Sequence, residues 1–409
     1  MFSLSKRAKL LPVSPIRRLA PLATAAARAG KTVYYLNIGQ PDIETFPAFM
    51  RGAAKVPKIV AYSPSQGISE ARVAWSNYYK RHNINFTPQQ ITVTTGASEA
   101  LSFAMLSLCD PGDEILIPEP FYAIYKSYAT INDAVVKPIT TYVEDGFHIP
   151  SKEAIEAQIT PRTKAILICN PSNPTGTVYT LEEMKWLRDV ALNNGLFLIA
   201  DEVYREFVYD GREYFSLFHL DGIEQCAIMV DSISKRFSAC GARIGCVASY
   251  NPDIIDVFTK YGQARLSPPA MSEYGLVEVL NDPQTDVQLD NMVARFKARR
   301  DVLYEGLQDI PGVLCHKPRG AFYVVAKLPV ESSEDFCAWL LSDFDLDGQT
   351  VMMAPAADFY ATPGLGKDEV RIAYVLNRDD LKKSLQVLKA ALEVYPGTKM
   401  QAAVKSEAS

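Results

Sequence analysis

The sequence contains no apolar run that approaches the roughly 18 residues needed to cross a bilayer, so no membrane-spanning helix is expected. Its 7 cysteines are scattered and form no Cys-x-x-Cys pair. This argues against a disulfide framework or a structural zinc site, and it favours a reducing compartment. Cations are not in excess either, because 42 Lys and Arg against 47 Asp and Glu give a net charge of −5. Binding to nucleic acid or to an anionic membrane requires clustered cations, so neither partner is expected.

Glycine and proline number only 22 and 26 among 409 residues, which excludes a collagen-like or low-complexity chain. The basic N-terminal stretch has no apolar core followed by a small-residue cleavage site, so we expect no secretory signal. An organelle transit peptide is the alternative for this Arg-rich, acid-poor stretch. We therefore expect a cytosolic protein, and at about 150 residues per domain the length predicts two to three domains.

Short apolar runs alternate with amphipathic stretches between Thr87 and Tyr250. Continuous apolar runs of five or six residues, separated by helical patterns, are typical of strands buried on both faces of a mostly parallel sheet. The fold class predicted from this alternation is α/β. The predicted strands are residues 91–95, 114–118, 134–139, 165–169, 196–200, 226–230 and 244–249, and clear helical patterns cover 98–109, 181–194 and 286–307.

The pattern changes after residue 300 to that of a smaller α+β domain. A hairpin is expected over 312–328, a helix over 332–344, a strand over 369–375 and a last helix that ends near Val394. The first 44 residues hold too little apolar periodicity to fold alone, so we expect them to pack on the smaller domain or on a partner. The predicted domains are an N-terminal arm with part of the small domain (1–44), a large domain (45–300) and a small C-terminal domain (301–409).

Polar residues follow four of the predicted strands, at the ends where open α/β sheets bind their ligands. The strand at 91–95 leads into Gly96-Ala97-Ser98 and a helix, a set of backbone donors suited to phosphate. The next three such ends carry NPSNPTG (170–176), DEVY (201–204) and DSISK (231–235), with GARIG (241–245) shortly after. Together they supply an amide, a carboxylate, a phenol, a lysine and an arginine. This set suits an anionic, phosphorylated cofactor that offers an aldehyde to Lys235 and a basic nitrogen to Asp201.

In this order and spacing, NPSNPTG, DEVY, SISK and GARIG resemble the motifs of class I aminotransferases of the pyridoxal-phosphate fold type I. The resemblance extends from NIGQPD (37–42) to RIAY (371–374), nearly the whole chain. It implies a large domain that binds pyridoxal 5′-phosphate (PLP) on a mostly parallel central sheet, with a smaller α+β domain. Each motif alone is only moderately specific, but all of them together are very specific.

The resemblance implies a catalytic set of Lys235, Asp201 and Tyr204. Lys235 corresponds to the lysine that forms a Schiff base with the cofactor and moves the substrate's α-proton, and burial would lower its pKa. Asp201 corresponds to the carboxylate that keeps the pyridine nitrogen protonated, so that the ring withdraws electrons from the carbanion. Asn173 and Tyr204 correspond to the residues that hydrogen-bond the ring's phenolic oxygen. A helix cap for Asp201 and a turn residue for Asn173 are the ordinary alternatives.

The resemblance also implies how the remaining cofactor contacts are divided. Tyr122 corresponds to the aromatic residue that stacks on the pyridine ring, although a core position is an equal alternative for it. Tyr62 corresponds to the tyrosine that reaches the phosphate from the neighbouring subunit, which implies a homodimer with shared sites. The family usually has a bulkier residue in place of Ala242. The phosphate itself would be bound by Gly96, Ala97, Ser98, Ser232, Ser234 and Arg243.

Substrate binding is implied for Gly39, Asn173 and Arg371, with Arg371 clamping the α-carboxylate by two parallel hydrogen bonds. Some relatives have a lysine at the position of Ser98 that binds a distal carboxylate. Because serine cannot supply that charge, Arg265 in QARLSPP is the candidate cation for a dicarboxylic substrate, and an interface or surface arginine is the alternative.

We therefore predict a cytosolic, homodimeric, PLP-dependent aminotransferase that transfers an amino group between an amino acid and a 2-oxo acid in ping-pong order. Bacterial aspartate aminotransferases are the nearest resemblance, so aspartate and 2-oxoglutarate are the first expected substrates. Aromatic, alanine or prephenate aminotransferases are alternatives within the class. A PLP-dependent C–S lyase is a further alternative, but its phosphate-loop motifs are absent. A DNA-binding regulator would need a module that the roughly 40 residues before the first motif do not provide.

Overall fold

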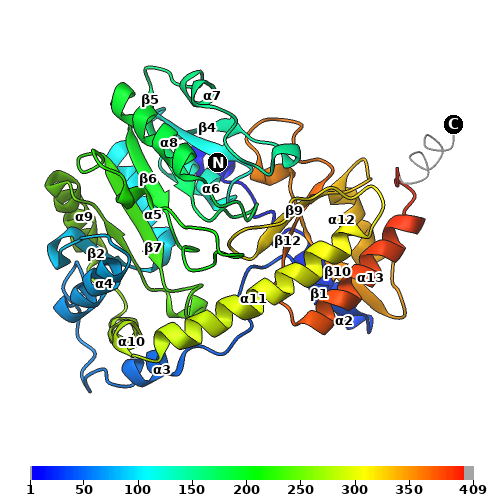
Figure 1. The fold of residues 1–409 in the computed structure, drawn as a ribbon, viewed down its shortest axis with the longest axis horizontal. Coiled ribbons are helices and arrows are strands. Elements are labelled where there is room, and N and C mark those ends of the chain that lie inside the picture. The colour runs from blue at the N-terminus through cyan, green and yellow to red at the C-terminus, as the bar shows by residue number, and fades with distance from the viewer. Residues whose placement is uncertain (1, 400–409) are drawn as a thin grey trace.

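A seven-stranded sheet forms the centre of the larger part of the molecule in the computed structural model, which describes residues 2–399 (Figure 1). The strand order is β2-β8-β7-β6-β5-β3-β4, and only β8 runs antiparallel to its neighbours. This confirms the predicted α/β class with a mostly parallel sheet. The strands are β2 (Ile91–Thr94), β3 (Glu114–Glu119), β4 (Val135–Thr140), β5 (Thr163–Cys169), β6 (Phe197–Asp201), β7 (Ala227–Ser232) and β8 (Gly245–Ala248).

Helices cover both faces of this sheet, and their ends follow local signals. The N-terminus of α8 (Leu181–Asn194) has a capping box between Thr180 and Glu183, and Gly195 ends the helix in the left-handed region. Because β3, β5, β6 and β7 are almost fully buried along their length, apolar residues occupy both faces of each strand. Other helices of this part are α3 (Pro47–Ala53), α4 (Ser69–Arg81), α5 (Gly96–Leu108), α6 (Ile124–Ile131), α7 (Lys152–Glu156), α9 (Pro252–Arg265) and α10 (Ala270–Asn281).

The smaller part contains two short sheets. One is the antiparallel sheet β11-β12-β9, and the other pairs β1 in parallel with β10. Since α2 packs on α12 and β1 pairs with β10, residues 20–35 pack on the smaller part. The elements are α2 (Ala20–Arg28), β1 (Thr32–Tyr35), β9 (Tyr323–Lys327), α12 (Ser333–Ser342), β10 (Gln349–Met352), β11 (Ala354–Pro355), β12 (Glu369–Ala373) and α13 (Arg378–Val394). The short helix α1 (Lys6–Leu10) instead contacts α6 of the larger part.

Two features of the smaller part differ from the sequence prediction. The expected hairpin over 312–328 is reduced to one bridge between Leu314 and Lys327, because β9 pairs with β12 instead. In addition, the predicted domain boundary at residue 300 falls inside α11 (Thr285–Gln308), a single helix that runs across both parts of the molecule (Figure 1). Residues 400–409 of the predicted C-terminal domain lie outside the described residues.

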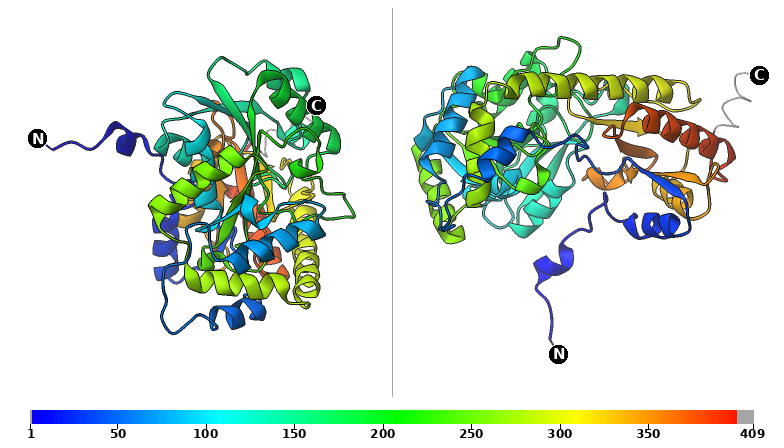
Figure 2. Two further views of the ribbon diagram at one scale, coloured as in Figure 1. Left: turned by 90° about the vertical axis from the view of Figure 1, so that its left-hand side faces the viewer. Right: turned by 90° about the horizontal axis from the view of Figure 1, so that it is seen from below.

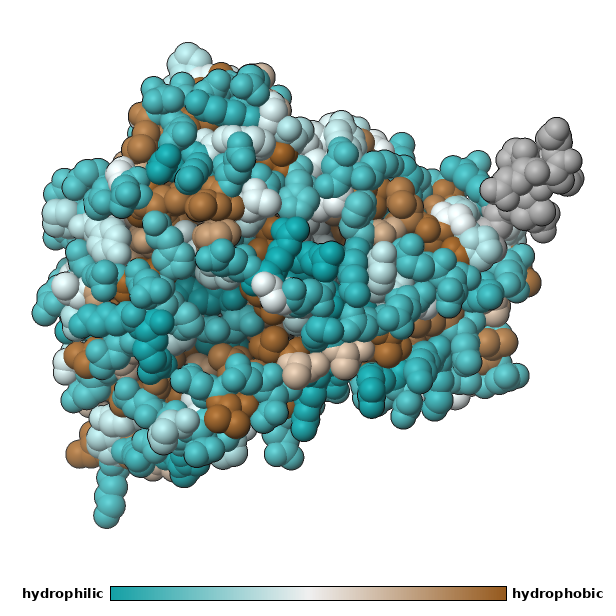
Figure 3. Space-filling model, viewed as in Figure 1, coloured by the Kyte–Doolittle hydropathy of each residue, from teal (hydrophilic) through white to brown (hydrophobic). Residues whose placement is uncertain are grey.

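Hydrophilic residues predominate on the face shown in Figure 3, with apolar residues scattered between them. The start of the chain, residues 2–10, projects from the body on one side (Figure 2). Within residues 2–399, no helix combines the length and the apolar character that a bilayer crossing requires.

Candidate active site

The carboxyl ends of the central parallel strands open onto a cavity of about 970 Å³. In the register of the sheet, Cys169 at the end of β5 lies beside Asp201 at the end of β6, and β7 ends next to them at Ser232. Segments far apart in the sequence therefore meet at one edge, as expected for an α/β sheet. The predicted site residues that line the cavity are Gly39, Ala97, Ser98, Tyr122, Asn173, Asp201, Tyr204, Ser232, Ser234, Lys235, Arg243 and Arg371.

Lys235 lies in the turn after β7, and its Nζ donates a hydrogen bond to the carbonyl oxygen of Gly39 at 2.8 Å. Burial lowers the pKa of Lys235, and the nearby guanidinium of Arg371 contributes a smaller shift in the same direction. A lysine with a lowered pKa supplies a neutral amine at lower pH than a solvent-exposed lysine. Lys235 is therefore suited to act as a nucleophile or as a base.

Gly39 is required by close packing rather than by its backbone angles. A Cβ atom at this position would lie 1.8 Å from the Tyr323 hydroxyl oxygen. Tyr323 itself lines the cavity, and its hydroxyl lies 2.8 Å from that of Tyr204. Tyr323 was not among the predicted site residues, because GAFY carries no pattern that separates a site tyrosine from a core tyrosine.

Asp201 is 5% exposed, and its carboxylate accepts hydrogen bonds from the Tyr125 hydroxyl at 2.7 Å and from the Val203 backbone N–H at 3.3 Å. Burial raises the pKa of Asp201 to about 6, and the hydrogen bond from Tyr125 opposes this shift. The carboxylate is therefore suited to hold a proton in place on a basic nitrogen. Tyr125 was also missed, since only Tyr122 in the same segment was singled out from the sequence.

A group of hydrogen-bond donors lies around the N-terminus of α5. The helix begins at Gly96, where φ is +73°, and Ala97 and Ser98 line the cavity in its first turn. A Cβ atom on Gly96 would lie 2.6 Å from Nη2 of Arg243, so glycine permits the guanidinium to approach the helix end. The hydroxyl oxygens of Ser232 and Ser234, 2.7 Å apart, also line the cavity. Backbone N–H groups, hydroxyls and an arginine together are the donors that a phosphate group requires.

Arg371 of β12 is 1% exposed and has no carboxylate partner among residues 2–399. Its Nη1 donates to Asn173 Oδ1 at 3.1 Å and its Nη2 to the Asn37 carbonyl oxygen at 2.5 Å. Its buried Nε has no hydrogen-bond acceptor within the described chain. Burial lowers the pKa of Arg371. Because an unpaired buried charge is strongly destabilising, this arrangement calls for an anionic ligand, and a carboxylate matches the planar guanidinium.

Three predicted site residues do not line the cavity. Gly96 lies directly behind it, next to Arg243, as described above. Tyr62 is 81% exposed and lies in a surface segment. The structure places Arg265 away from the cavity, in an ion pair with Glu99 at 3.0 Å, and its Nη2 donates to the Ser65 carbonyl oxygen at 2.8 Å. Arg265 therefore already has acceptors for its charge within its own chain.

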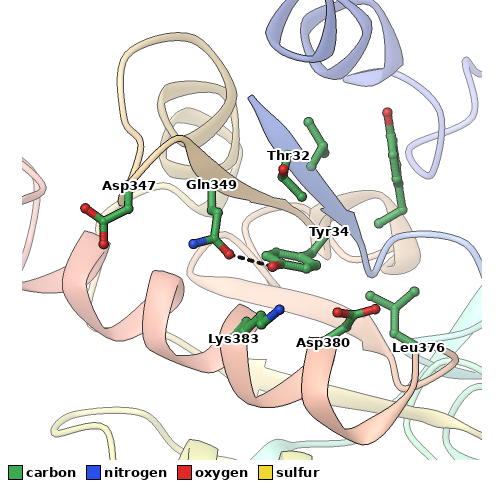
Figure 4. A pocket seen from close by; sticks show the side chains of 9 residues that line it. Thr32, Tyr34, Asp347, Gln349, Leu376, Asp380 and Lys383 are labelled. Atoms are coloured by element: carbon green, nitrogen blue, oxygen red, sulfur yellow. Dashed lines mark hydrogen bonds between the residues drawn. The ribbon is translucent and has the colours of Figure 1, made fainter. Parts of the chain in front are cut away.

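A second cavity of about 600 Å³ lies in the smaller part, between β1, β10 and the start of α13 (Figure 4). There the Tyr34 hydroxyl donates to Gln349 Oε1 at 2.5 Å, with Asp380 and Lys383 on the opposite side. None of the predicted site residues lines this cavity. The candidate chemistry is therefore concentrated in the larger cavity.

Comparison with known proteins agrees with this geometry. Residues 31–388 match the family described as aminotransferase class I and II. A probable aspartate/prephenate aminotransferase of Aquifex aeolicus is 31% identical over 95% of this chain and 98% of its own length. Aspartate aminotransferase from Thermus thermophilus with maleate has a TM-score of 0.86 and 28% identity, covering 96% of this chain and all of that one. Alanine aminotransferase from Pyrococcus furiosus has a TM-score of 0.87 and 27% identity, and the match covers 95% of this chain and 99% of that one.

Proposed function

The chain belongs to the class I and II aminotransferases, and from this premise we propose that it is an enzyme that uses PLP in the larger cavity to transfer amino groups. The family and the fold type I architecture of its structural neighbours agree with the predicted aminotransferase activity. The observation that supports the proposal most strongly is Arg371, a buried cation without an anionic partner in the described chain, in one cavity with Lys235 and Asp201.

The residues present fit PLP. The donors at the start of α5, together with Ser232, Ser234 and Arg243, would hold its phosphate. Lys235 would bind its aldehyde carbon covalently, and Tyr122 would pack on the ring. When bound, PLP supplies an electron sink for the charge that develops at the substrate's Cα.

The side chains of this enzyme perform the remaining tasks. Arg371 binds the α-carboxylate of the substrate and so orients Cα toward Lys235. Once the substrate's amino group has displaced it from the cofactor, Lys235 Nζ would accept the proton that leaves Cα and hold it for return. Water must then enter to release the 2-oxo acid, which completes half of the ping-pong cycle. Asp201 would hold a proton on the pyridine nitrogen by charge and hydrogen bonding, and Asn173 and Tyr204 would hydrogen-bond the ring's phenolic oxygen.

We propose aspartate and 2-oxoglutarate as the first substrate pair. Support comes from the names of the relatives, which include aspartate and aspartate/prephenate aminotransferases. Because an alanine aminotransferase is among the structural neighbours, a monocarboxylic amino donor is the second candidate. Wild-type protein, scanned for cofactor absorbance and assayed with a panel of amino acids and 2-oxo acids, tests both. Release of ammonia or sulfide without a 2-oxo acid would instead identify a lyase.

We also propose that the enzyme works as a homodimer in the cytoplasm. The assignment of Tyr62 to the partner's cavity is supported by its exposure and by its absence from the lining of its own chain's cavity. Ile59 and Val60 beside it are also exposed, at 82% and 60%, so a second copy would cover an apolar segment. The cytoplasmic location rests on seven free thiols, which suit a reducing compartment.

Mixing two variants tests the shared site. Tyr62→Phe protomers and Lys235→Ala protomers should form heterodimers in which one site carries both substitutions and the other carries neither. We expect activity and PLP affinity to recover in the mixture, because the unmutated site has both its tyrosine and its lysine. Differently tagged protomers, purified by both tags, measure this directly. If purified heterodimers show no more activity than the parent variants, Tyr62 does not act across the interface.

A further inference from the structure

The cavity contains more cations than the proposed reaction uses. Arg371 is assigned to the α-carboxylate, Arg243 to the phosphate and Lys235 to the chemistry. The remaining three come from the N-terminal segment and from α6. Among the described residues, the cationic side chains that line the cavity are Arg17, Arg18, Lys126, Lys235, Arg243 and Arg371.

Two of the remaining three cations already have partners. Arg18 forms ion pairs with Glu334 at 3.0 Å and Asp358 at 2.9 Å. Lys126 donates to the carbonyl oxygens of Asp358 and Tyr360, and burial lowers its pKa. Both side chains therefore fasten the N-terminal segment and α6 to residues 358–360. Neither is free to bind a substrate.

Arg17 differs from both. Its guanidinium makes no hydrogen bond, ion pair or ring contact with any residue in 2–399, although it lines the cavity. Arg17 is exposed, its backbone N–H donates to the Ser14 carbonyl oxygen at 3.1 Å, and Pro15 and Leu19 of the same turn are buried. The turn therefore presents an unpaired positive charge at the cavity.

The same segment is coupled to the substrate clamp through Asn37. The side-chain amide of Asn37 donates to the Ile16 carbonyl oxygen at 2.7 Å. The backbone carbonyl of Asn37 accepts the hydrogen bond from Arg371 Nη2. Asn37 thus contacts both the clamp and the turn that carries Arg17, and the two arginines line the same cavity.

We propose that Arg17 binds the distal carboxylate of a dicarboxylic substrate, while Arg371 binds the α-carboxylate. This rests on the proposed aminotransferase function and names its substrate class. Ser98 supplies no charge, and Arg265 is already paired with Glu99 outside the cavity lining. Among the cavity-lining cations of residues 2–399, Arg17 is the one with neither an assigned role nor a side-chain partner, and a carboxylate provides the bidentate acceptor that a guanidinium requires.

The test compares Arg17→Ala with the wild-type holoenzyme. We expect KM for aspartate and for 2-oxoglutarate to rise about 10- to 100-fold, because a charge-assisted pair is lost, while KM for a monocarboxylic donor such as alanine changes less than about twofold. Arg28→Ala is the matched control, since Arg28 lies on the exposed side of α2 and does not line the cavity. Equal changes for both donor types, or none, would overturn the role of Arg17.

A binding measurement separates recognition from turnover. Calorimetry with succinate, a dicarboxylate that carries no amino group, should show about 10- to 100-fold weaker binding to the Arg17→Ala holoenzyme, and Arg17→Lys should restore part of the loss. Acetate, which occupies only the α-carboxylate position, should bind both proteins equally. Unchanged succinate binding would overturn the proposal. If instead the wild-type holoenzyme transaminates no amino acid at all, the proposed function fails, and the succinate result distinguishes this from a failure of Arg17 alone.

Discussion

Lys235→Ala should reduce transamination on the order of 10³-fold or more, equivalent to about 4 kcal/mol in the barrier, while leaving the fold intact. The reason is that Lys235 Nζ lies 2.8 Å from the Gly39 carbonyl oxygen in the cavity in which we propose that the cofactor binds. In our proposal this amine binds the cofactor and also moves the proton at Cα. Steady-state assays and borohydride reduction followed by mass spectrometry measure both roles. Reduction should fix the cofactor to the wild type and not to the variant.

Lys260→Ala provides the control for this experiment. Lys260 is exposed on α9 and pairs only with Asp256 on the same helix, so its removal should change neither turnover nor reduction. Near-wild-type turnover in Lys235→Ala, together with a reducible bond to the chain, would contradict the central assignment. Unchanged thermal unfolding of both variants would show that the fold is preserved.

Asp201→Asn should reduce kcat far more than it weakens PLP binding. An amide carries no charge to hold the proton on the pyridine nitrogen, so the electron sink is lost while the phosphate contacts at the start of α5 remain. Removal of a buried charge partner should raise the activation barrier by several kcal/mol, because the charge at the transition state loses its stabilisation. If kcat fell by less than about tenfold, which corresponds to about 1.4 kcal/mol in the activation barrier, the pairing of Asp201 with the pyridine nitrogen would be contradicted. Kinetics and equilibrium dialysis of PLP separate the two effects.

Tyr125→Phe is a graded comparison for the same carboxylate. It removes the 2.7 Å hydrogen bond to Asp201 but leaves the charge in place, so the loss in kcat should be smaller than for Asp201→Asn. Because that hydrogen bond lowers the pKa of Asp201, its removal should raise the pKa of the carboxyl in the cofactor-free protein above about 6. Asp201 would then protonate at a higher pH. Infrared titration of the carboxyl band measures this shift, and a lower pKa would contradict the interpretation.

The sequence by itself determined the strands of the large sheet and the polar residues that follow them. The central strands β5, β6 and β7 contain continuous apolar runs, and their burial on both faces follows from that local composition. Because parallel strands end at the same edge, Asn173, Asp201 and Lys235 were expected to meet, and all three line the same cavity. Their chemical types, together with the order of the motifs, identified the family.

The tertiary structure alone decided which side chains have partners and which do not. Arg265 ends α9 and Arg17 lies in the turn before α2, but the first is neutralised by Glu99, 166 positions away, while the second has no side-chain acceptor among the described residues. Tyr323 reaches Tyr204 across 119 positions, and Arg371 reaches Asn37 across 334. Local periodicity carries no information about such contacts, because they depend on how distant segments pack and on how much solvent remains around each charge. Only the folded chain therefore shows which charges are paired. For the same reason, only the folded chain shows that Arg17, rather than Arg265, is the candidate residue for substrate specificity.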